Sequence, residues 1–330
     1  MTFTVRVAGG ESFAARGDES LLAAAARAGV GLPCDCRLGG CGACRVMLLS
    51  GSVVYDEEPM ALTPEDAEDG FALACQAKPT SDVEISIASA VLSPPRRCSA
   101  AVRAVRMLAP DVAHLQIAAD GGDVEFQPGQ YVKVLLDRGG TRNFSMASRP
   151  AGPDLDFHIR CIRGGRFTDG ALRQLVPGDR LEIELPHGAF FYRENDMRPI
   201  VMAATGTGLA PIKSMLEALL EAPEHPPVTL YWGARTLADL YLHGDISTWR
   251  ERYADFRYEP VLSRPDSSWR GRRGYVQDAV RDDCDELSGH AVYLCGSPLM
   301  IAAAREAFAL HGADPGYIYA DSFTFQADAR

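Results

Sequence analysis

Four cysteines restrict the fold of this sequence more than any other feature. Cys36, Cys41 and Cys44 are separated by four and then two residues, and Cys75 follows after thirty more. This spacing is typical of the plant-type [2Fe–2S] site, in which four thiolates hold two irons. Zinc is the alternative, but zinc ligands usually come as two closely spaced pairs, whereas Cys75 has no neighbouring cysteine. The pattern therefore predicts an iron–sulfur cluster ligated by all four residues.

The residues between the first three cysteines suit a loop that wraps around a cluster. Gly39, Gly40 and Gly42 permit unusual backbone angles and let amide N–H groups approach the sulfurs. Such donors stabilise the negative cluster and tune its potential. Four further cysteines fall outside the spacing and are predicted to be ordinary buried or surface residues: Cys34, Cys98, Cys161 and Cys284.

Size and charge exclude several classes of function. The 330 residues suit two or three domains. The net charge of −11 argues against nucleic acid as a partner, because phosphates would repel it. Residues 1–95 hold 13 acidic against 6 basic residues, which suits a basic protein partner; simple solubility is the alternative. No apolar run reaches the roughly 18 residues of a membrane span, and the amino terminus lacks signal-peptide features, so we expect a cytoplasmic enzyme without a membrane partner.

The chain is expected to divide at two places. Ser93–Arg97 is proline-rich and basic, as in a stiff linker. Polar residues at Glu194–Pro199 precede a buried strand and mark the second boundary. We therefore expect three domains, over residues 1–93, 98–196 and 197–330.

Each domain has its own pattern of elements. The first alternates apolar residues over 3–7 and 83–87 and carries an alanine-rich helix at 21–28. The second is strand-dominated with Gly and Pro turns, which predicts an antiparallel β-barrel. The third alternates apolar strands with helices, which predicts a parallel doubly wound α/β sheet. Expected barrel strands lie at 101–105, 114–119, 130–136, 156–162 and 180–185, and expected helices of the third domain near 210–221, 244–253 and 298–311.

With these features the chain resembles a known family. Residues 1–93 are similar to a plant-type ferredoxin, and the remainder resembles the ferredoxin–NADP reductase superfamily. The domain order is similar to that of the reductase components of bacterial aromatic-ring dioxygenases and multicomponent monooxygenases. The resemblance implies an α+β, β-grasp ferredoxin domain, an FAD-binding barrel and a Rossmann-like NAD(P) domain. It favours FAD over FMN, because FMN-using relatives place the ferredoxin domain last.

The tetrapeptide Arg142-Asn143-Phe144-Ser145 is similar to the family's Arg-x-Tyr-Ser flavin motif. A planar guanidinium suits the flavin pyrophosphate, since it forms paired charge-assisted hydrogen bonds. The resemblance implies that the aromatic ring stacks on the isoalloxazine and that the Ser145 hydroxyl reaches its N5 edge. Phe144 replaces the usual tyrosine, so stacking is kept, one hydroxyl hydrogen bond is lost, and flavin affinity or potential is expected to differ.

A second flavin element follows, by resemblance, where a predicted strand runs into a glycine-rich turn. Glycines before a helix let backbone N–H groups meet phosphate oxygens, and a threonine adds a side-chain donor. The alternative is an ordinary strand–turn–helix junction capped by that threonine. The residues assigned to FAD in this element are His158, Ile159, Arg160, Gly164, Gly165, Arg166 and Thr168.

The third domain begins with a buried strand and the glycine-rich turn Thr205–Pro211. Such turns bind dinucleotide phosphates, because the backbone and the helix N-terminus both present donors. Two later strand ends, Trp232–Thr236 and Leu294–Met300, lie where ligands bind in parallel sheets. The residues assigned to the nicotinamide nucleotide are Gly206, Thr207, Gly208, Pro211, Gly233, Arg235, Cys295, Gly296 and Pro298.

Three residues are the candidates for the catalytic centre. By resemblance, Cys295 would lie beside the nicotinamide ring, although a buried core cysteine that ends a strand is the alternative. Relatives place an aromatic residue near the flavin face, and Phe323, which follows the predicted strand Tyr317–Asp321, is the candidate. Ser145 completes the set.

The choice between NADH and NADPH depends on a basic segment. Ser263 and Arg264, followed by Arg272–Tyr275, resemble the residues with which NADPH-specific relatives bind the 2′-phosphate. The alternative is a solvated basic turn that leads into a strand at Tyr275–Val276. Reductases of this domain order mostly use NADH, and Pro265 changes the backbone after Arg264. We therefore expect NADH, with NADPH as the alternative.

Together these sites predict an electron-transfer reductase. Hydride passes from NADH to FAD, and single electrons pass on to a cluster whose plant-type potential is typically about −400 mV. We expect the acceptor to be a terminal oxygenase or an intermediate ferredoxin. Two alternatives stay open: a reductase for a deoxysugar dehydratase, and an electron carrier whose reductase half is inert.

Overall fold

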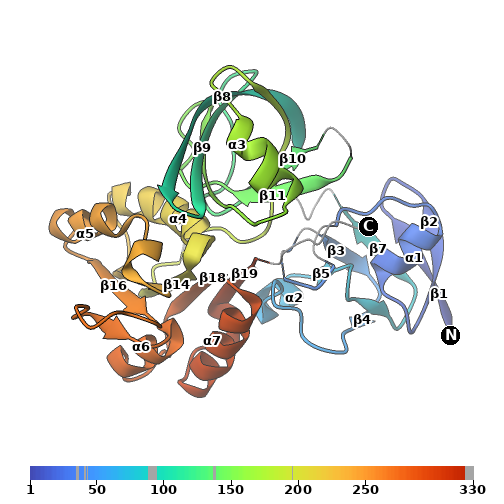
Figure 1. Cartoon of the computed structure of the whole chain (residues 1–330). Helices are drawn as coiled ribbons and strands as arrows, with labels where there is room; N and C mark the ends of the chain where they lie inside the picture. Colours follow the sequence, from blue (N-terminus) through green and yellow to red (C-terminus); the bar gives the residue numbers. More distant parts are fainter. Residues whose placement is uncertain are drawn as a thin grey trace. The chain divides into compact units, whose positions relative to one another are not determined.

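A computed structural model describes residues 1–34, 37–40, 42, 44–87, 95–136, 139–194 and 196–323 (Figure 1). Contacts divide the chain into two compact units, the first mainly Met1–Pro94 and the second most of the later residues. Ser93, Pro94 and Asn195, which belong to the two expected boundaries, lie outside the described residues. No helix in the described part of the chain is long and apolar enough to cross a membrane.

The first unit holds a five-stranded sheet with the order β2-β1-β7-β3-β5. β1 pairs parallel with β7 and antiparallel with β2, and its alternating residues Val5 and Val7 face the core. Helix α1 begins where the Ser20 side chain accepts a hydrogen bond from Ala23 N. The predicted α+β fold is confirmed. The elements are β1 (Thr2–Val7), β2 (Ser12–Arg16), α1 (Leu21–Arg27), β3 (Arg45–Ser50), β4 (Val53–Val54), α2 (Pro64–Glu68), β5 (Phe71–Leu73), β6 (Lys78–Pro79) and β7 (Val83–Ser86).

The second unit begins with an antiparallel barrel whose six strands have the order β11-β10-β13-β8-β9-β12. A bridge between Met146 and Phe157, both buried, joins the two ends of this sheet. The predicted barrel is confirmed, and its first strand already begins at Arg96, inside the expected linker. The elements are β8 (Arg96–Ala109), β9 (Val112–Ala119), β10 (Tyr131–Leu135), β11 (Thr141–Ser145), β12 (Asp154–Arg160), the π-helical turn Arg166–Ala171, α3 (Leu172–Gln174) and β13 (Arg180–His187).

The later part of the chain forms a second six-stranded sheet, with the order β17-β16-β15-β14-β18-β19. The strands from β16 to β18 in this order pair in parallel, so the predicted doubly wound sheet is confirmed. The chain leaves β14 toward β15 on one side and returns as β18 on the other, which makes the ends of β14 and β18 the expected ligand crevice. The elements are β14 (Ile200–Thr205), α4 (Leu209–Glu221), β15 (Val228–Ala234), α5 (His243–Arg252), β16 (Phe256–Leu262), β17 (Arg272–Arg273), α6 (Val276–Asp283), β18 (Ala291–Gly296), α7 (Pro298–Leu310) and β19 (Ile318–Ser322).

The strand expected at Tyr275–Val276 is wrong. Tyr275 is the residue before helix α6, and Val276 is the first residue of that helix. The buried residues Val276, Ala279 and Val280 recur with the spacing of a helix, whereas two residues are too few to show the alternation of a strand. The short strand β17 lies just before, at Arg272–Arg273.

Candidate cofactor sites

Two of the four predicted cluster ligands lie in described parts of the structure. Cys44 is buried and directly precedes β3, whereas Cys75 is partly buried in the turn after β5. The phenol of Tyr55 is within electrostatic reach of both thiols: burial is the main cause that raises the pKa of Tyr55 to about 12, and the charges of Cys44 and Cys75 add to it. Cys36 and Cys41 lie outside the described residues.

The loop predicted to carry three ligands packs, at Gly39 and Cys44, on the turn predicted to carry the fourth. Gly39 and Gly42 both have φ angles of +70°, which glycine adopts without strain. A Cβ on Gly39 would overlap the side chain of Gln76, and Ala74 N donates to the carbonyl of Cys44 at 3.0 Å. This approach of two thiol-bearing segments fits a cluster held by cysteine thiolates. The four-cysteine ligand set stays a prediction.

The predicted flavin motif forms strand β11 and runs to its end. The Arg142 Nη1 donates to the carbonyl of Thr141 at 2.9 Å, and the Phe144 ring lies 5.4 Å from that of Phe167 between centroids. The Asn143 Oδ1 is buried and has no hydrogen-bond partner among the described residues. A buried acceptor without a partner is costly, and a flavin hydroxyl or N–H would satisfy it. Together with the guanidinium and the buried Ser145, this strand fits FAD.

The second predicted flavin element uses several of its polar groups within its own turn. Gly164 N donates to the Asp169 carboxylate at 2.8 Å, and the Thr168 hydroxyl accepts from Ile162 N at 3.3 Å. The Ile159 side chain is buried in the barrel core. These bonds favour the alternative of a strand–turn–helix junction, and phosphate contacts from this turn stay a prediction. Gly165 precedes the π-helical turn, and Arg166 is exposed.

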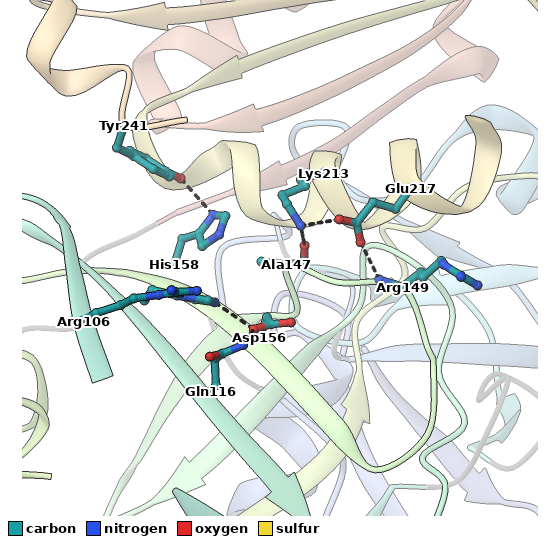
Figure 2. A network of polar contacts seen from close by, with 10 residues as sticks. Arg106, Gln116, Ala147, Arg149, Asp156, His158, Lys213, Glu217 and Tyr241 are labelled. Atoms are coloured by element: carbon teal, nitrogen blue, oxygen red, sulfur yellow. Dashed lines mark hydrogen bonds and ion pairs between the residues drawn. The ribbon is translucent and has the colours of Figure 1, made fainter. Parts of the chain in front are cut away.

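His158, predicted to serve FAD, links the barrel to the nicotinamide domain. Its Nδ1 lies 3.1 Å from the Tyr241 hydroxyl, as Figure 2 shows. The Tyr241 ring meets the Trp232 ring edge-on at 5.1 Å, and Trp232 Nε1 donates to the carbonyl of Gly206 at 3.0 Å. The chain of contacts thus runs from strand β12 to the glycine-rich turn. Burial is the main cause that lowers the pKa of His158 to about 3, and the positive charge of Lys213 adds to it.

A polar cluster of the barrel lies beside the ring of His158 (Figure 2). Arg106 Nε donates to His114 Nδ1 at 3.0 Å, so the hydrogen of this imidazole is on Nε2, which faces the Asp156 carboxylate at 2.8 Å. Burial alone would raise the pKa of Asp156, but hydrogen bonds from His114 and Gln116 lower it below its usual range. The His114 ring lies edge-on to His158 at 5.8 Å. His158 is therefore neutral at the junction between the barrel and the nicotinamide domain.

The junction is expected to weaken in mild acid. The folded-state pKa of His158 is about 3, whereas the unfolded value is near 6.5. The contribution of the neutral imidazole to the free energy of unfolding is therefore present above pH 6.5 and is lost as the pH falls toward 3. We expect wild type to lose on the order of 2 kcal/mol more unfolding free energy between pH 7 and pH 5 than His158→Asn does. Urea unfolding at both pH values measures this, with the surface residue His290→Asn as the control. Equal losses in all three proteins would contradict it.

The predicted nicotinamide residues meet where β14 and β18 end. The turn Gly206–Gly208 follows β14, and a Cβ on Gly208 would overlap the carbonyl of Cys295, which is buried at the end of β18. Gly296 has a φ of +152°, and a Cβ there would overlap the Thr205 hydroxyl. Such close packing of two strand ends fits a dinucleotide site, in which the backbone of a glycine-rich turn binds the phosphates. Thr207 and Gly208 are buried in the turn, Pro211 is buried in the first turn of α4, and Pro298 begins α7.

Two residues from other parts of the unit lie beside the ends of β14 and β18. Arg160, at the end of β12, pairs with Asp111 at 3.4 Å, and a Cβ on Gly206 would lie 3.4 Å from its guanidinium. Phe323 N donates to the carbonyl of Gly296 at 2.8 Å. Arg160 and Phe323 thus lie next to the predicted nicotinamide site, although sequence reasoning assigned both to the flavin.

Sequence reasoning missed the residues that connect the two halves of this unit. Tyr241 lies in an irregular stretch after β15, where no spacing marks it. Lys213 and Glu217 stand four apart on α4, a pattern that usually indicates a solvent-exposed ion pair. Ser214 is buried, with no motif around it.

The three domains match known protein families. Residues 5–80 match the 2Fe-2S iron-sulfur cluster binding domain, residues 99–192 the oxidoreductase FAD-binding domain, and residues 202–306 the oxidoreductase NAD-binding domain. The fold and its sites therefore define an oxidoreductase that uses a [2Fe–2S] cluster, FAD and a nicotinamide nucleotide.

Relatives share this organisation over nearly the whole chain. Terephthalate 1,2-dioxygenase reductase component 1 of Comamonas sp is 37% identical over 314 residues, which are 92% of each chain. The CDP-6-deoxy-L-threo-D-glycero-4-hexulose-3-dehydrase reductase of Yersinia pestis is 34% identical over 94% of this chain and 95% of that one. The crystal structure of a cytochrome P450 reductase of Amycolatopsis has a TM-score of 0.72 and 35% identity, over 97% and 98%. The chain belongs to this family of iron–sulfur flavoprotein reductases, and the resemblance seen in its sequence is confirmed.

Proposed function

We propose that this cytoplasmic protein takes hydride from NADH and delivers single electrons, through FAD and the [2Fe–2S] cluster, to a terminal oxygenase. The observation that supports it most is the junction in the second unit, where Arg160 of the barrel lies beside Gly206 of the nicotinamide turn. The two predicted nucleotide sites therefore lie next to each other. When bound, FAD supplies the change from a two-electron donor to a one-electron acceptor.

Each predicted residue then has a definite task. Arg142 binds the flavin pyrophosphate by charge, Ser145 offers its hydroxyl to the N5 edge, and Cys295 packs beside the nicotinamide ring. Phe323 lies at the flavin face in this proposal, and its backbone bond to Gly296, the neighbour of Cys295, brings it close to the nicotinamide residues. Ser145 is 9% exposed and Cys295 is fully buried.

Arg142→Ala is expected to yield protein that is partly depleted of FAD, because a lost charge-assisted contact typically costs about 1.5–3 kcal/mol. Ser145→Ala should keep its flavin but reduce it more slowly in stopped-flow measurements with NADH. Arg103→Ala is the matched control, since this exposed arginine of the same barrel lies 3.8 Å from Asp154. Full flavin content in Arg142→Ala, together with a normal rate in Ser145→Ala, would remove both residues from the site.

The basic segment supports NADH as the donor. Arg264 N donates to the carbonyl of Arg235 at 2.8 Å, so the ends of β15 and β16 lie side by side, and both arginine side chains are exposed. The Ser263 hydroxyl donates to a backbone carbonyl at 3.3 Å. Arg272 is paired with two aspartates of α6. Of the residues that would bind a 2′-phosphate, Ser263 and Arg272 are therefore engaged within the protein. Gly233, also assigned to the nucleotide, is buried near the end of β15.

Wild type is expected to show a higher kcat/KM for NADH than for NADPH, and Arg264→Ala should change that ratio by less than about tenfold, or about 1.4 kcal/mol. Steady-state kinetics with both nucleotides measures this. Arg270→Ala, an exposed arginine in the same segment, is the control. A tenfold preference for NADPH that disappears in Arg264→Ala would establish a 2′-phosphate site instead.

The acceptor is a basic protein in this proposal. Glu57 and Glu58 are exposed and directly precede Pro59, and a Cβ on Gly39 of the cluster loop would lie 3.1 Å from Pro59. Negative charge beside the loop would steer a basic partner toward the cluster. An intermediate ferredoxin that passes the electrons on to the oxygenase is the alternative first acceptor.

Reconstitution with purified partners tests the function. We expect NADH oxidation to be coupled to substrate turnover by a terminal oxygenase, with a rate that falls as salt is added. A second candidate function is supply of electrons to a deoxysugar dehydratase, which the Yersinia pestis relative favours. Turnover with a dehydratase and none with an oxygenase would decide for it.

A further inference from the structure

Helix α4 forms hydrogen bonds with a short backbone segment of the FAD-binding barrel, as Figure 2 shows. This segment, Ala147–Arg149, receives a partner from the helix at each of its three residues. Lys213 Nζ donates to its first carbonyl at 2.9 Å, and the Ser214 hydroxyl donates to its second carbonyl at 2.7 Å. Glu217 accepts from the backbone N–H of its third residue at 3.2 Å. One face of α4 therefore holds three consecutive residues of the barrel.

Two of the three contacts, those of Lys213 and Ser214, are partly buried, and the third, from Arg149 N to Glu217, is exposed. Ser214 is fully buried, and the side chains of Lys213 and Glu217 are 19% and 25% exposed and bond to each other. All three partners on the barrel are backbone groups, so the contacts fix the position of the chain rather than recognise particular side chains. Truncating Lys213 or Ser214 would leave a partly buried backbone carbonyl without its partner, which is unfavourable.

The helix and the segment each continue directly into a predicted cofactor site. α4 begins at Leu209, the residue after the nicotinamide turn Gly206–Gly208. The segment begins at Ala147, two residues after Ser145. Met146 and Ala147, which connect Ser145 to the rest of the segment, are both fully buried. Their backbone N–H groups are bonded to the barrel, that of Ala147 to Asp156 at 2.7 Å. Movement of α4 would therefore be transmitted to Ser145 over a short and rigid path.

We propose that Lys213, Ser214 and Glu217 are positioning residues that set the separation between the nicotinamide turn and Ser145. In the reaction the nicotinamide C4–H bond breaks and a flavin N5–H bond forms, so NADH is oxidised by two electrons and the flavin is reduced by two. The reacting atoms need to be about 3–3.5 Å apart, and a misplacement of about 1 Å can cost a factor on the order of 100. This role rests on the proposed function, since it supposes that hydride passes at this junction.

Ser214→Ala and Lys213→Met in the full-length holoprotein test the proposal. We expect flavin reduction at saturating NADH to slow by roughly tenfold while the KM for NADH changes by less than about twofold, because binding groups are untouched. The isotope effect with 4-deuterated NADH should become more temperature-dependent. Hydrogen exchange in a peptide that spans Ala147–Arg149 should speed up, with or without nucleotide. Ser214→Thr and Lys213→Arg should restore both readouts in part.

Glu221→Gln is the matched control. Glu221 lies on the same helix and contacts the Arg149 side chain at 2.8 Å, but both partners are nearly half exposed, and such pairs contribute little. Its hydride transfer and hydrogen exchange should equal those of wild type. A normal rate and isotope effect in Ser214→Ala and Lys213→Met would overturn the proposal, as would a slow rate with unchanged exchange. If wild type does not reduce its flavin with NADH, the proposed function fails, whereas the exchange experiment still tests the contacts.

Discussion

Cys75→Ser is expected to lower NADH-dependent reduction of cytochrome c, a one-electron acceptor, by more than about 100-fold while NADH still reduces the flavin. A serine hydroxyl is a harder and more weakly coordinating ligand than a thiolate, so the cluster is lost or distorted. The flavin and nicotinamide residues lie in the other compact unit of the chain, so hydride transfer should persist. Electron paramagnetic resonance of the reduced protein measures the cluster, and stopped-flow absorbance measures the flavin.

Cys34→Ser is the control for this experiment. Cys34 lies two residues before Cys36 in the sequence and packs against the same core as Cys75. It falls outside the ligand spacing. It should retain the signal and the cytochrome c activity of wild type. An unchanged resonance signal in Cys75→Ser would remove Cys75 from the ligand set, and loss of the signal in Cys34→Ser would place Cys34 in it.

Gly208→Ala is expected to cost about 1–3 kcal/mol of unfolding free energy and to slow flavin reduction by NADH on the order of 100-fold. The new methyl group would overlap the carbonyl of Cys295. Backbone cannot rotate away as a side chain can, so the ends of β14 and β18 must separate. Thermal unfolding and stopped-flow reduction measure the two effects.

Gly244→Ala is the matched substitution, because a Cβ on Gly244, in helix α5, would have no atom within 4 Å. Alanine is the better helix residue, so this variant should be as stable as wild type or more stable by about 0.5–1 kcal/mol. Its hydride transfer should not change. If Gly208→Ala behaves like Gly244→Ala, the two strand ends do not form the nicotinamide site.

Much of the organisation follows from local patterns. The spacing of Cys36, Cys41 and Cys44 indicates the cluster before any fold is known, because few other sites need three thiolates within nine residues. Strands separated by Gly and Pro turns in one domain, and strands alternating with helices in the next, distinguished the barrel from the doubly wound sheet correctly. The pattern failed at Tyr275–Val276, where two residues were too few to tell a strand from the first turn of α6.

Assignments that depended on side-chain direction stay predictions. His158 and Ile159 were both assigned to FAD, yet one contacts Tyr241 and the other faces the barrel core. Neighbours on a strand point to opposite faces, and the sequence does not say which face meets the cofactor. Thr168 resembled a phosphate donor, but its hydroxyl accepts from Ile162 N within the turn.

The sequence by itself determined the order of the domains, their fold classes and the cofactors that they bind, because each depends on residues that are near one another in the chain. Only the tertiary structure decided which groups meet at the junction. Lys213 and Ala147 are 66 residues apart, and Tyr241 and His158 are 83 apart. Such pairs form because the barrel and the parallel sheet pack into one compact unit, and no local spacing in the chain encodes that packing.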